Sequence, residues 1–303
     1  MINVRKLAEK INIRGRLLFE EPMRYHTSFK IGGPADLFVI PANQEELKKI
    51  LFICKEESAP YFLLGSGANI LVSDKGIRGV VIDLKNLGGI SVEGNRISAG
   101  AGVPISDVSL EACNNSLTGL EFIYSMPGSV GGSVWMNARC YGKSVSDILE
   151  KVTILDKNLF TQELAVDKSE FGYKVSPFQK NKSVILAATF KLKTGKREKS
   201  EEEMDSIRRD REKKGHFLFP SAGSVFKNNR DFGMPTGKLL ERVGLKGLQI
   251  GEARVSDFHA NIIINMGNAR ASDVKKLIEM AESRINEQFG FKLEREIIFV
   301  GEW

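Results

Sequence analysis

Cysteine is scarce in this chain. Its three cysteines, Cys54, Cys113 and Cys140, are odd in number and far apart in the sequence. Such an arrangement supports neither a disulfide framework nor a structural zinc site. We therefore expect reduced thiols and no bound metal.

Long apolar runs are also lacking. No stretch approaches the roughly 18 to 20 consecutive apolar residues that a membrane-spanning helix needs. The first residues, "MINVRKLAEKINIRG", carry charges throughout and contain no apolar core of a secretory signal. These absences predict a cytoplasmic protein without a membrane partner.

Blocks of one charge sign are missing as well. The chain has 44 Lys and Arg against 38 Asp and Glu, a formal net charge of +6, but no long basic block. This balance permits a nucleic-acid partner and favours smaller anions, such as phosphates, as the groups that the excess charge attracts. We expect small-molecule ligands and no nucleic acid.

The first part of the sequence combines short strands with helices. Its 303 residues, 42% of them hydrophobic, are enough for two domains or for one domain with an elaborated second. Asn43 can cap a helix over residues 43–57. Strands are predicted by short β-branched runs between Gly-rich turns, at residues 61–64, 79–84, 90–99, 151–156 and 184–192. An α+β region follows from this pattern.

The composition changes sharply at residues 193–217, where charged residues dominate. We expect a helix over 201–214 and a domain boundary in this stretch. Beyond it the sequence predicts a helix at 236–243, a strand at 261–265, a long helix after Ser272 and a final strand, "REIIFVG". The long helix has an apolar stripe and ends at Gly290, a suitable C′ residue; the stripe consists of Val274, Leu277, Ile278, Ala281, Ile285 and Phe289.

Two glycine-rich stretches follow predicted strands or turns. "LLGSGANILV" spans 63–72 and "SMPGSVGGSVWMNARCYG" spans 125–142. Neither has the Gly-x-Gly-x-x-Gly spacing of a dinucleotide-binding helix turn, so a Rossmann fold is not supported. Glycine lets the backbone approach a flat or anionic ligand closely, although a plain hairpin-type turn explains the first stretch equally well. Together they suggest a long, anionic, aromatic cofactor.

A third stretch, "PSAGSVFKN" at 220–228, places a lone serine, Ser224, after Gly223. Because Gly223 can adopt φ values closed to other residues, a tight backbone can present the Ser224 hydroxyl outward. The local sequence by itself favours a polar turn that leads into a strand.

Seven blocks in order resemble one enzyme family: "HTSFKIGGPAD", "LLGSGANILV", "MPGSVGGSVWMNA…YG", "FGYKVSPF", "PSAGSVFKN", "GLKGLQIGEARVSDFHANIIIN" and "LEREIIFVG". From about residue 24 to the C-terminus the chain resembles the enolpyruvyl-UDP-N-acetylglucosamine reductases of bacterial peptidoglycan synthesis, in the shorter of the family's two types.

The resemblance implies an α+β fold. It consists of an FAD-binding domain of the vanillyl-alcohol-oxidase (PCMH-like) type, with two α+β subdomains, over 24–195, and an α+β substrate-binding domain over 201–303. It also implies that NADPH reduces FAD, and that hydride passes from the flavin N5 to the enolpyruvyl methylene carbon. UDP-N-acetylmuramate would be the product.

The same resemblance implies the site residues. Hydride addition leaves an enolate-like intermediate whose carbon must be protonated while its charge is held. By resemblance Ser224 is the proton donor, Glu296 the catalytic carboxylate, and Lys174 stands where the family usually carries a catalytic Arg. The implied substrate-binding residues are Tyr173, Lys214, Asn228, Lys246 and His259. The implied FAD-binding residues are Gly65, Ser66, Gly67, Ala68, Asn69, Ile70, Pro127, Gly128, Ser129, Val130 and Gly132.

Two other readings remain open from the residues. A flavin oxidase of the same fold would turn over oxygen and need no NADPH. A non-catalytic protein that binds a UDP-sugar or nucleotide would be colourless.

Overall fold

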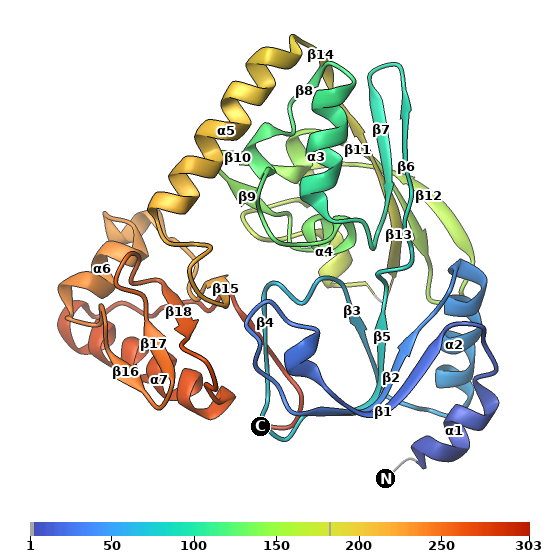
Figure 1. The fold of residues 1–303 in the computed structure, drawn as a ribbon, viewed down its shortest axis with the longest axis horizontal. Helices are drawn as coiled ribbons and strands as arrows, with labels where there is room; N and C mark the ends of the chain where they lie inside the picture. The colour runs from blue at the N-terminus through green and yellow to red at the C-terminus, as the bar shows by residue number, and fades with distance from the viewer. Residues whose placement is uncertain (1–2, 182) are drawn as a thin grey trace. The chain divides into compact units, whose positions relative to one another are not determined.

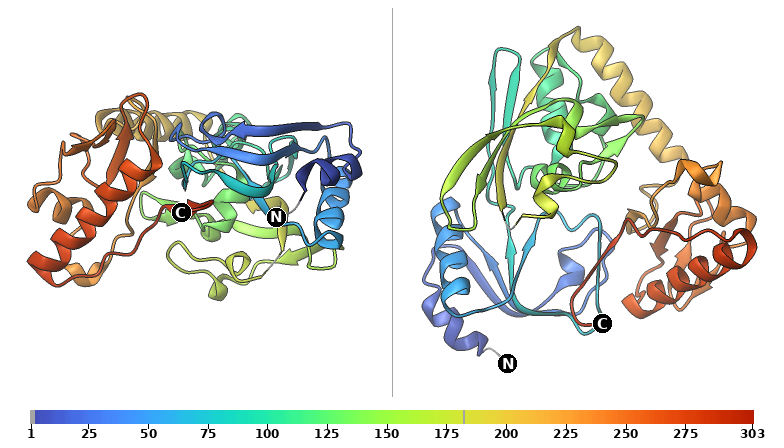
Figure 2. Two further views of the ribbon diagram at one scale, coloured as in Figure 1. Left: turned by 90° about the horizontal axis from the view of Figure 1, so that it is seen from below. Right: turned by 180° about the vertical axis from the view of Figure 1, so that it is seen from behind.

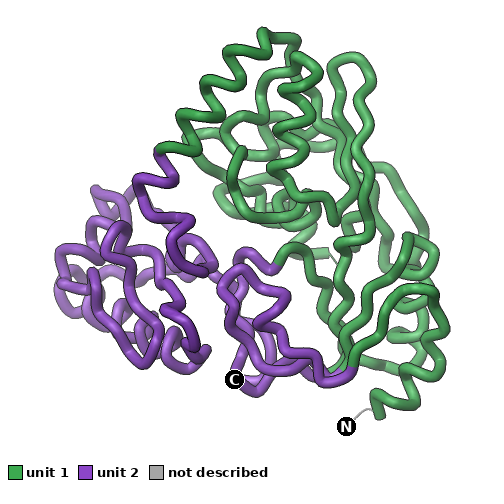
Figure 3. Tube along the Cα trace, viewed as in Figure 1, with its two compact units in different colours: residues 1–18, 37–66, 79–209 green, residues 19–36, 67–78, 210–303 purple. Residues whose placement is uncertain are grey.

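The computed structural model describes residues 3–181 and 183–303 and contains two compact units (Figure 3). Unit 1 comprises residues 1–18, 37–66 and 79–209, and unit 2 comprises residues 19–36, 67–78 and 210–303. Both units are therefore discontinuous in sequence. The assignment of FAD binding to 24–195 and of substrate binding to 201–303 stays a prediction, because compactness does not locate a ligand.

The N-terminal part of the chain forms a four-stranded sheet in the order β1-β2-β5-β3. Its helix α2 begins after Asn43, whose side chain accepts a hydrogen bond from the Glu46 N–H at 3.0 Å, as the sequence predicts. The apolar side of α2 is buried in the core of unit 1. The elements here are α1 (Val4–Lys10), β1 (Arg16–Pro22), η1 (Met23–Tyr25), β2 (Pro34–Ile40), α2 (Gln44–Glu56), β3 (Tyr61–Leu64) and β5 (Ile77–Asp83).

A second sheet of unit 1 has five strands in the order β12-β11-β13-β7-β6, with α3 and α4 on one of its faces (Figure 1). Its strands are β6 (Ile90–Glu93), β7 (Arg96–Gly100), β11 (Leu149–Leu155), β12 (Thr161–Ala165) and β13 (Val184–Lys191). The remaining elements of this region are α3 (Ile105–Asn114), β8 (Leu117–Thr118), η2 (Glu121–Ile123), α4 (Val130–Trp135), β9 (Arg139–Cys140), β10 (Lys143–Ser144), η3 (Val145–Asp147), η4 (Lys168–Glu170), η5 (Pro177–Gln179), β14 (Lys193–Thr194) and α5 (Arg197–Lys213).

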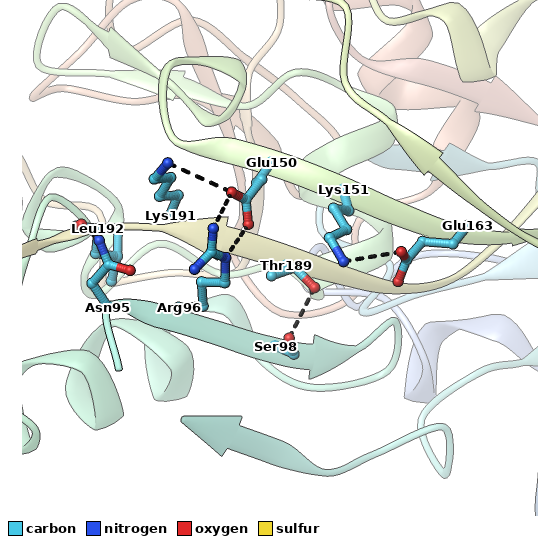
Figure 4. A network of polar contacts seen from close by, with 9 residues as sticks. All are labelled: Asn95, Arg96, Ser98, Glu150, Lys151, Glu163, Thr189, Lys191 and Leu192. Atoms are coloured by element: carbon cyan, nitrogen blue, oxygen red, sulfur yellow. Dashed lines mark hydrogen bonds and ion pairs between the residues drawn. The ribbon is translucent and has the colours of Figure 1, made fainter. Parts of the chain in front are cut away.

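Part of the other face of this sheet is polar (Figure 4). Successive residues of a strand point to opposite faces, so one set of side chains enters the core and the alternate set meets solvent. On this polar patch Arg96 makes a bidentate ion pair with Glu150, at 2.6 and 2.9 Å. The hydroxyls of Ser98 and Thr189 form a hydrogen bond at 2.8 Å. The hydrogen bonds from Arg96 lower the pKa of Glu150. Along these strands, alternation thus separates the buried side chains beside α3 and α4 from this polar patch.

Unit 2 packs a long helix against a small antiparallel sheet of order β15-β18-β17-β16 (Figure 2). The strand β19 pairs in parallel with β4, so the C-terminal end of the chain adds to a segment from the first quarter of the sequence. The elements are β4 (Ile70–Val72), β15 (Ser221–Ser224), η6 (Arg230–Phe232), α6 (Thr236–Arg242), β16 (Gln249–Ile250), β17 (Ala253–Val255), β18 (Ile262–Asn265), α7 (Ala271–Phe289) and β19 (Ile298–Val300).

The long helix predicted after Ser272 is confirmed as α7. The stripe residues from Val274 to Ile285 are buried, Phe289 packs partly buried against the same core, and Gly290 takes the left-handed C-cap conformation with φ +68°. Two predicted strands are wrong in extent. Residues 90–99 form a hairpin of β6 and β7, because Gly94 with φ +59° turns the chain there. The final strand is shorter than "REIIFVG" and begins at Ile298.

The N-terminus of α7 is capped from outside the helix. The two carboxylate oxygens of Asp74 accept hydrogen bonds from the Ala271 and Ser272 N–H groups, at 2.8 and 3.0 Å. A carboxylate at this end satisfies free N–H groups and interacts favourably with the helix dipole. Among the helices that the structure describes, none is long and apolar enough to cross a membrane.

We predict that Asp74→Ala lowers the free energy of unfolding by about 1–2 kcal/mol, the usual effect of losing a helix cap. Urea unfolding followed by circular dichroism measures this change. Asp205→Ala, on the exposed side of α5, is the matched control and should change stability by less than about 0.5 kcal/mol. Equal effects of the two substitutions would contradict the capping role.

Candidate active site

The two glycine-rich stretches meet in unit 1. A Cβ atom at Gly65, just after β3, would lie 2.4 Å from the Ser129 Oγ, so only glycine allows this approach. Ser129 is the N-cap of α4, and its hydroxyl accepts a hydrogen bond from the Gly132 N–H at 3.3 Å. The contact brings the predicted residues Gly65 and Ser129 together, while Ser66 is exposed.

The second stretch is fixed by its own backbone. The Val130 N–H donates to the Val103 carbonyl at 2.8 Å, and the Ile105 N–H donates to the Gly128 carbonyl at 2.9 Å. Gly128 has φ +149°, a conformation that favours glycine, and Pro127 beside it is exposed. Because its N–H is already engaged, Val130 shapes the loop and offers no backbone donor to a ligand.

A turn after this loop carries Tyr173 and Lys174. Gly172 and Val175 exchange two backbone hydrogen bonds, at 3.0 and 3.2 Å, which places Tyr173 and Lys174 at the tip. Lys174 has φ +60°, in the left-handed region where residues other than glycine are uncommon. Tyr173 is exposed and Lys174 half-buried.

In unit 2 the segment that holds Ser224 runs beside the C-terminal segment that holds Glu296. The Glu296 N–H donates to the Val225 carbonyl at 2.7 Å, and Phe226 pairs with Arg295 in an antiparallel bridge. Gly223 has φ +71°, which confirms the tight backbone expected before Ser224. Ser224 and Glu296 are half-buried. The structure therefore brings these two predicted residues into paired segments.

Lys227 and Glu294 extend the same pairing. The Lys227 N–H donates to the Glu294 carbonyl at 2.8 Å, and the Lys227 Nζ lies 2.5 Å from a Glu294 carboxylate oxygen. The Lys227 side chain is 18% exposed and the Glu294 side chain 72%. Glu294 thus neutralises a largely buried ammonium from the solvent side.

Asn261, the residue just before β18, forms hydrogen bonds with this segment. Its Oδ1 accepts from the Phe226 N–H at 2.9 Å and its Nδ2 donates to the Phe226 carbonyl at 2.8 Å. Its backbone carbonyl accepts from the Val225 N–H at 2.8 Å. Asn261 is buried, so all of these bonds are protected from water.

The first glycine stretch also reaches these segments. The Asn69 Nδ2 donates to the Glu296 carbonyl at 3.0 Å, and the Asn69 carbonyl accepts from the Ile298 N–H at 3.0 Å. Ile70 follows in the parallel pair of β4 and β19, opposite Ile298. Gly67, with φ +61°, lies against the His26 carbonyl, which a Cβ atom would approach to 2.2 Å. Its neighbour Ala68 is half-buried.

Three other predicted substrate residues of unit 2 form ion pairs or hydrogen bonds with neighbouring protein groups. Lys214 and Lys246 form ion pairs with Asp210, at 2.6 Å, and with Glu241, at 3.5 Å. The Asn228 Oδ1 accepts from the Thr236 N–H at 2.9 Å, which ties it to the first residue of α6.

Two histidines of unit 2 have low basicity. Burial lowers the pKa of His216 from its ordinary value to about 4, helped by the nearby cations Arg211 and Lys214 and by His259. Burial also lowers the pKa of His259, whose Nδ1 accepts a hydrogen bond from the Asn261 N–H at 3.2 Å. Both rings are therefore neutral at pH 7.

The chain is similar to known proteins over nearly its whole length. Family models described as "UDP-N-acetylenolpyruvoylglucosamine reductase, C-terminal domain" and "FAD binding domain" match residues 214–300 and 35–158. Two UDP-N-acetylenolpyruvoylglucosamine reductases are similar in sequence: that of Treponema denticola is 45% identical over 95% of each chain, and that of Caldanaerobacter subterraneus is 43% identical over 99% of each chain. The crystal structure of the enzyme from Thermus caldophilus is 31% identical, with a TM-score of 0.78 over 95% of this chain and 100% of that one.

The chain belongs to the UDP-N-acetylenolpyruvoylglucosamine reductase family. The predicted family, the α+β fold with an FAD-binding domain, and the cofactor FAD are thereby confirmed, while NADPH as the reductant stays a prediction. The reductase is an FAD-dependent oxidoreductase. The individual site residues stay predictions.

The surroundings of Gly65 and Ser129 in this reductase fit a flavin nucleotide. Ser133, on α4, is buried, and its Oγ has no hydrogen-bond partner within the described part of the chain. A buried hydroxyl that lacks a partner is costly unless a ligand supplies one. Small side chains and one such hydroxyl are what a long, flat, anionic cofactor needs.

Three residues around the reductase's site were missed from the sequence. Asn261, Asn137 and Gln179 each bond to backbone groups near a predicted catalytic residue. The only sequence signal was a polar residue beside a short apolar or aromatic run, as in "ANIII" and "VWMN". That pattern does not tell which backbone group the side chain meets.

We predict that the reductase loses stability as the pH falls from about 6.5 toward 4, in part through His216. The unfolded chain takes up a proton on this ring below its ordinary pKa, whereas the native ring stays neutral until its pKa of about 4. The thermal midpoint of His216→Gln should therefore fall less than that of the native chain between pH 7 and pH 5. Between pH 7 and pH 8 the ring is neutral in both states, so the difference between the two midpoints should stay constant there and serves as the baseline. A variant as acid-sensitive as the native chain would contradict the prediction.

Proposed function

We propose that this reductase converts UDP-N-acetyl-3-O-enolpyruvylglucosamine to UDP-N-acetylmuramate in peptidoglycan precursor synthesis, with Ser224, Glu296 and Lys174 as its catalytic residues. The observation that carries the proposal is the pairing of the Ser224–Asn228 and Glu294–Ile297 segments, because it holds a hydroxyl and a carboxylate on adjacent backbone segments. Family membership supports the reaction. We propose the cytoplasm as its compartment, since NADPH and nucleotide sugars are available there.

The reaction adds a hydride and a proton across the carbon–carbon double bond of the enol ether. When bound, FAD supplies the two-electron chemistry, taking a hydride from NADPH and giving it to the methylene carbon of the substrate. The Ser224 hydroxyl then donates its proton to the neighbouring carbon, which bears the carboxylate. The positive charge of Lys174 stabilises the negative charge that develops on that carboxylate. Glu296 is the catalytic carboxylate that acts, together with Ser224, on the enolate-like intermediate.

An unaided serine is a weak acid, so its proton donation needs support from its surroundings. Two lysines are candidates for this support, Lys227 and Lys214. We propose Lys227, because it lies in the same segment as Ser224 and its side chain is largely buried, although Glu294 partly offsets its charge at 2.5 Å. Lys214 is exposed and paired with Asp210.

The purified protein tests the activity directly. We expect a yellow holoenzyme that NADPH bleaches without oxygen and that the enolpyruvyl substrate turns yellow again. A flavin oxidase would be re-oxidised rapidly by oxygen and would not respond to the substrate. A non-catalytic binding protein would be colourless.

We predict that Ser224→Ala keeps FAD and the bleaching by NADPH but slows re-oxidation by the substrate by at least about 10²-fold, the usual effect of removing a general acid. Stopped-flow absorbance of the flavin measures each half-reaction. Ser221→Ala, in the same strand β15, is the matched control and should behave as the native chain. Rapid re-oxidation of Ser224→Ala would show that another group donates the proton.

We predict that Glu296→Gln also slows re-oxidation by about 10²-fold, while Glu294→Gln does not. The Glu294 side chain is mostly exposed, and its proposed role is only that of ion-pair partner to Lys227. The same stopped-flow experiment compares the two variants. Similar rates for both would mean that the wrong carboxylate was chosen.

A further inference from the structure

We propose that Gln179 is a positioning residue that fixes Lys174 for the reaction, together with Asn137. The proposal rests on the proposed function of Lys174 as the cation that stabilises the substrate carboxylate. Neither amide touches the reacting atoms in this scheme, since both bond to backbone carbonyls of unit 1.

The first step of the argument is the conformation of Lys174. It is the third residue of the four-residue turn Gly172–Val175, with φ +60°. At this position of a turn with positive φ, glycine or asparagine is usual, because a Cβ atom is disfavoured there. A long cationic side chain in this conformation needs surroundings that hold the backbone in place, and such strain is typical of functional positions.

The second step is how the turn is held. The Gln179 Nε2 donates to the Lys174 carbonyl at 3.0 Å and to the Trp135 carbonyl at 2.9 Å. The Asn137 Nδ2 donates to the Gly172 carbonyl at 2.8 Å, on the other side of the turn. Both carbonyls that flank the turn's tip are thus fixed by side-chain amides.

The third step is what the turn is held to. Trp135 is the last residue of α4, and Asn137 follows two residues later. The Ser176 hydroxyl, completely buried, also donates to the Trp135 carbonyl, at 2.6 Å. The other end of α4 begins at Ser129, in the loop that we assign to FAD. The position of Lys174 is therefore coupled, through one short helix, to the cofactor loop.

A displaced Lys174 should affect only the half-reaction in which the substrate re-oxidises the flavin. Reduction of the flavin by NADPH needs the cofactor loop and does not need Lys174. Re-oxidation by the substrate needs the Lys174 charge at a defined place, and a displacement of about 1 Å can cost about 10²-fold in rate. Loss of the Gln179 amide should therefore slow only the second half-reaction.

The test uses Gln179→Glu, which keeps the shape of the side chain but replaces both amide hydrogens with an acceptor. We expect re-oxidation of the reduced holoenzyme by the enolpyruvyl substrate to slow by about 10- to 100-fold. The bleaching rate with NADPH, the FAD affinity and the thermal midpoint should stay close to native values. Gln179→Met, which loses the donors without adding charge, should give the same pattern if the Glu variant folds poorly. Gln249→Glu is the control, since its Nε2 donates to the Gly251 carbonyl in an exposed turn of unit 2.

A parallel measurement on Lys174→Met separates the inference from the function on which it rests. If Lys174→Met is re-oxidised as fast as the native chain, the proposed function of Lys174 is wrong. If Lys174→Met is slow and both Gln179 variants are fast, Lys174 is catalytic and the positioning role of Gln179 is overturned. If the Gln179 variants lose FAD affinity or slow in both half-reactions alike, Gln179 serves stability alone, and the inference is overturned as well.

Discussion

The hydrogen bonds between the Asn261 side chain and the Phe226 backbone are the interaction on which the catalytic segment of unit 2 depends. β15 pairs with β18 at Ser221 and, after an irregularity, again at Ser224, where the strand ends, so the ladder does not extend to Phe226. Asn261 supplies both a donor and an acceptor there, and a buried backbone group without them would be costly. The segment is thereby free to pair on its other side with the C-terminal residues that include Glu296.

A comparable solution appears in unit 1, where regular structure is also absent. The turn at Gly172–Val175 is closed by two backbone hydrogen bonds of its own, and Lys174 at its tip is in a disfavoured conformation. Side-chain amides again replace a sheet or helix ladder, here from Asn137 and Gln179. In both units, then, candidate catalytic residues lie on irregular backbone that buried or half-buried amides hold in place. Irregular backbone can aim a side chain in directions that a ladder does not allow.

The regular parts of this fold could be predicted because their signals are local. The stripe of α7 repeats with the helical period, and Gly290 and Asn43 cap the helices where such residues are expected. The hairpin at 90–100 was missed because Gly94 and Asn95, a common turn pair, were read as part of one β-branched run. Asp74 could not be predicted as the cap of α7, since nearly 200 residues separate them in sequence.

The candidate site was predicted only in part for a related reason. The roles of Ser224, Glu296 and Lys174 came from the resemblance of seven blocks, and the bare residues would have indicated a turn, a surface carboxylate and a solvated lysine. Lysine carries no signal for positive φ, so its conformation had to come from the structure. With φ +60°, Lys174 is a strained cation whose turn two amides hold in place, which is unlike a surface residue, so the local geometry itself favours a specific role for it.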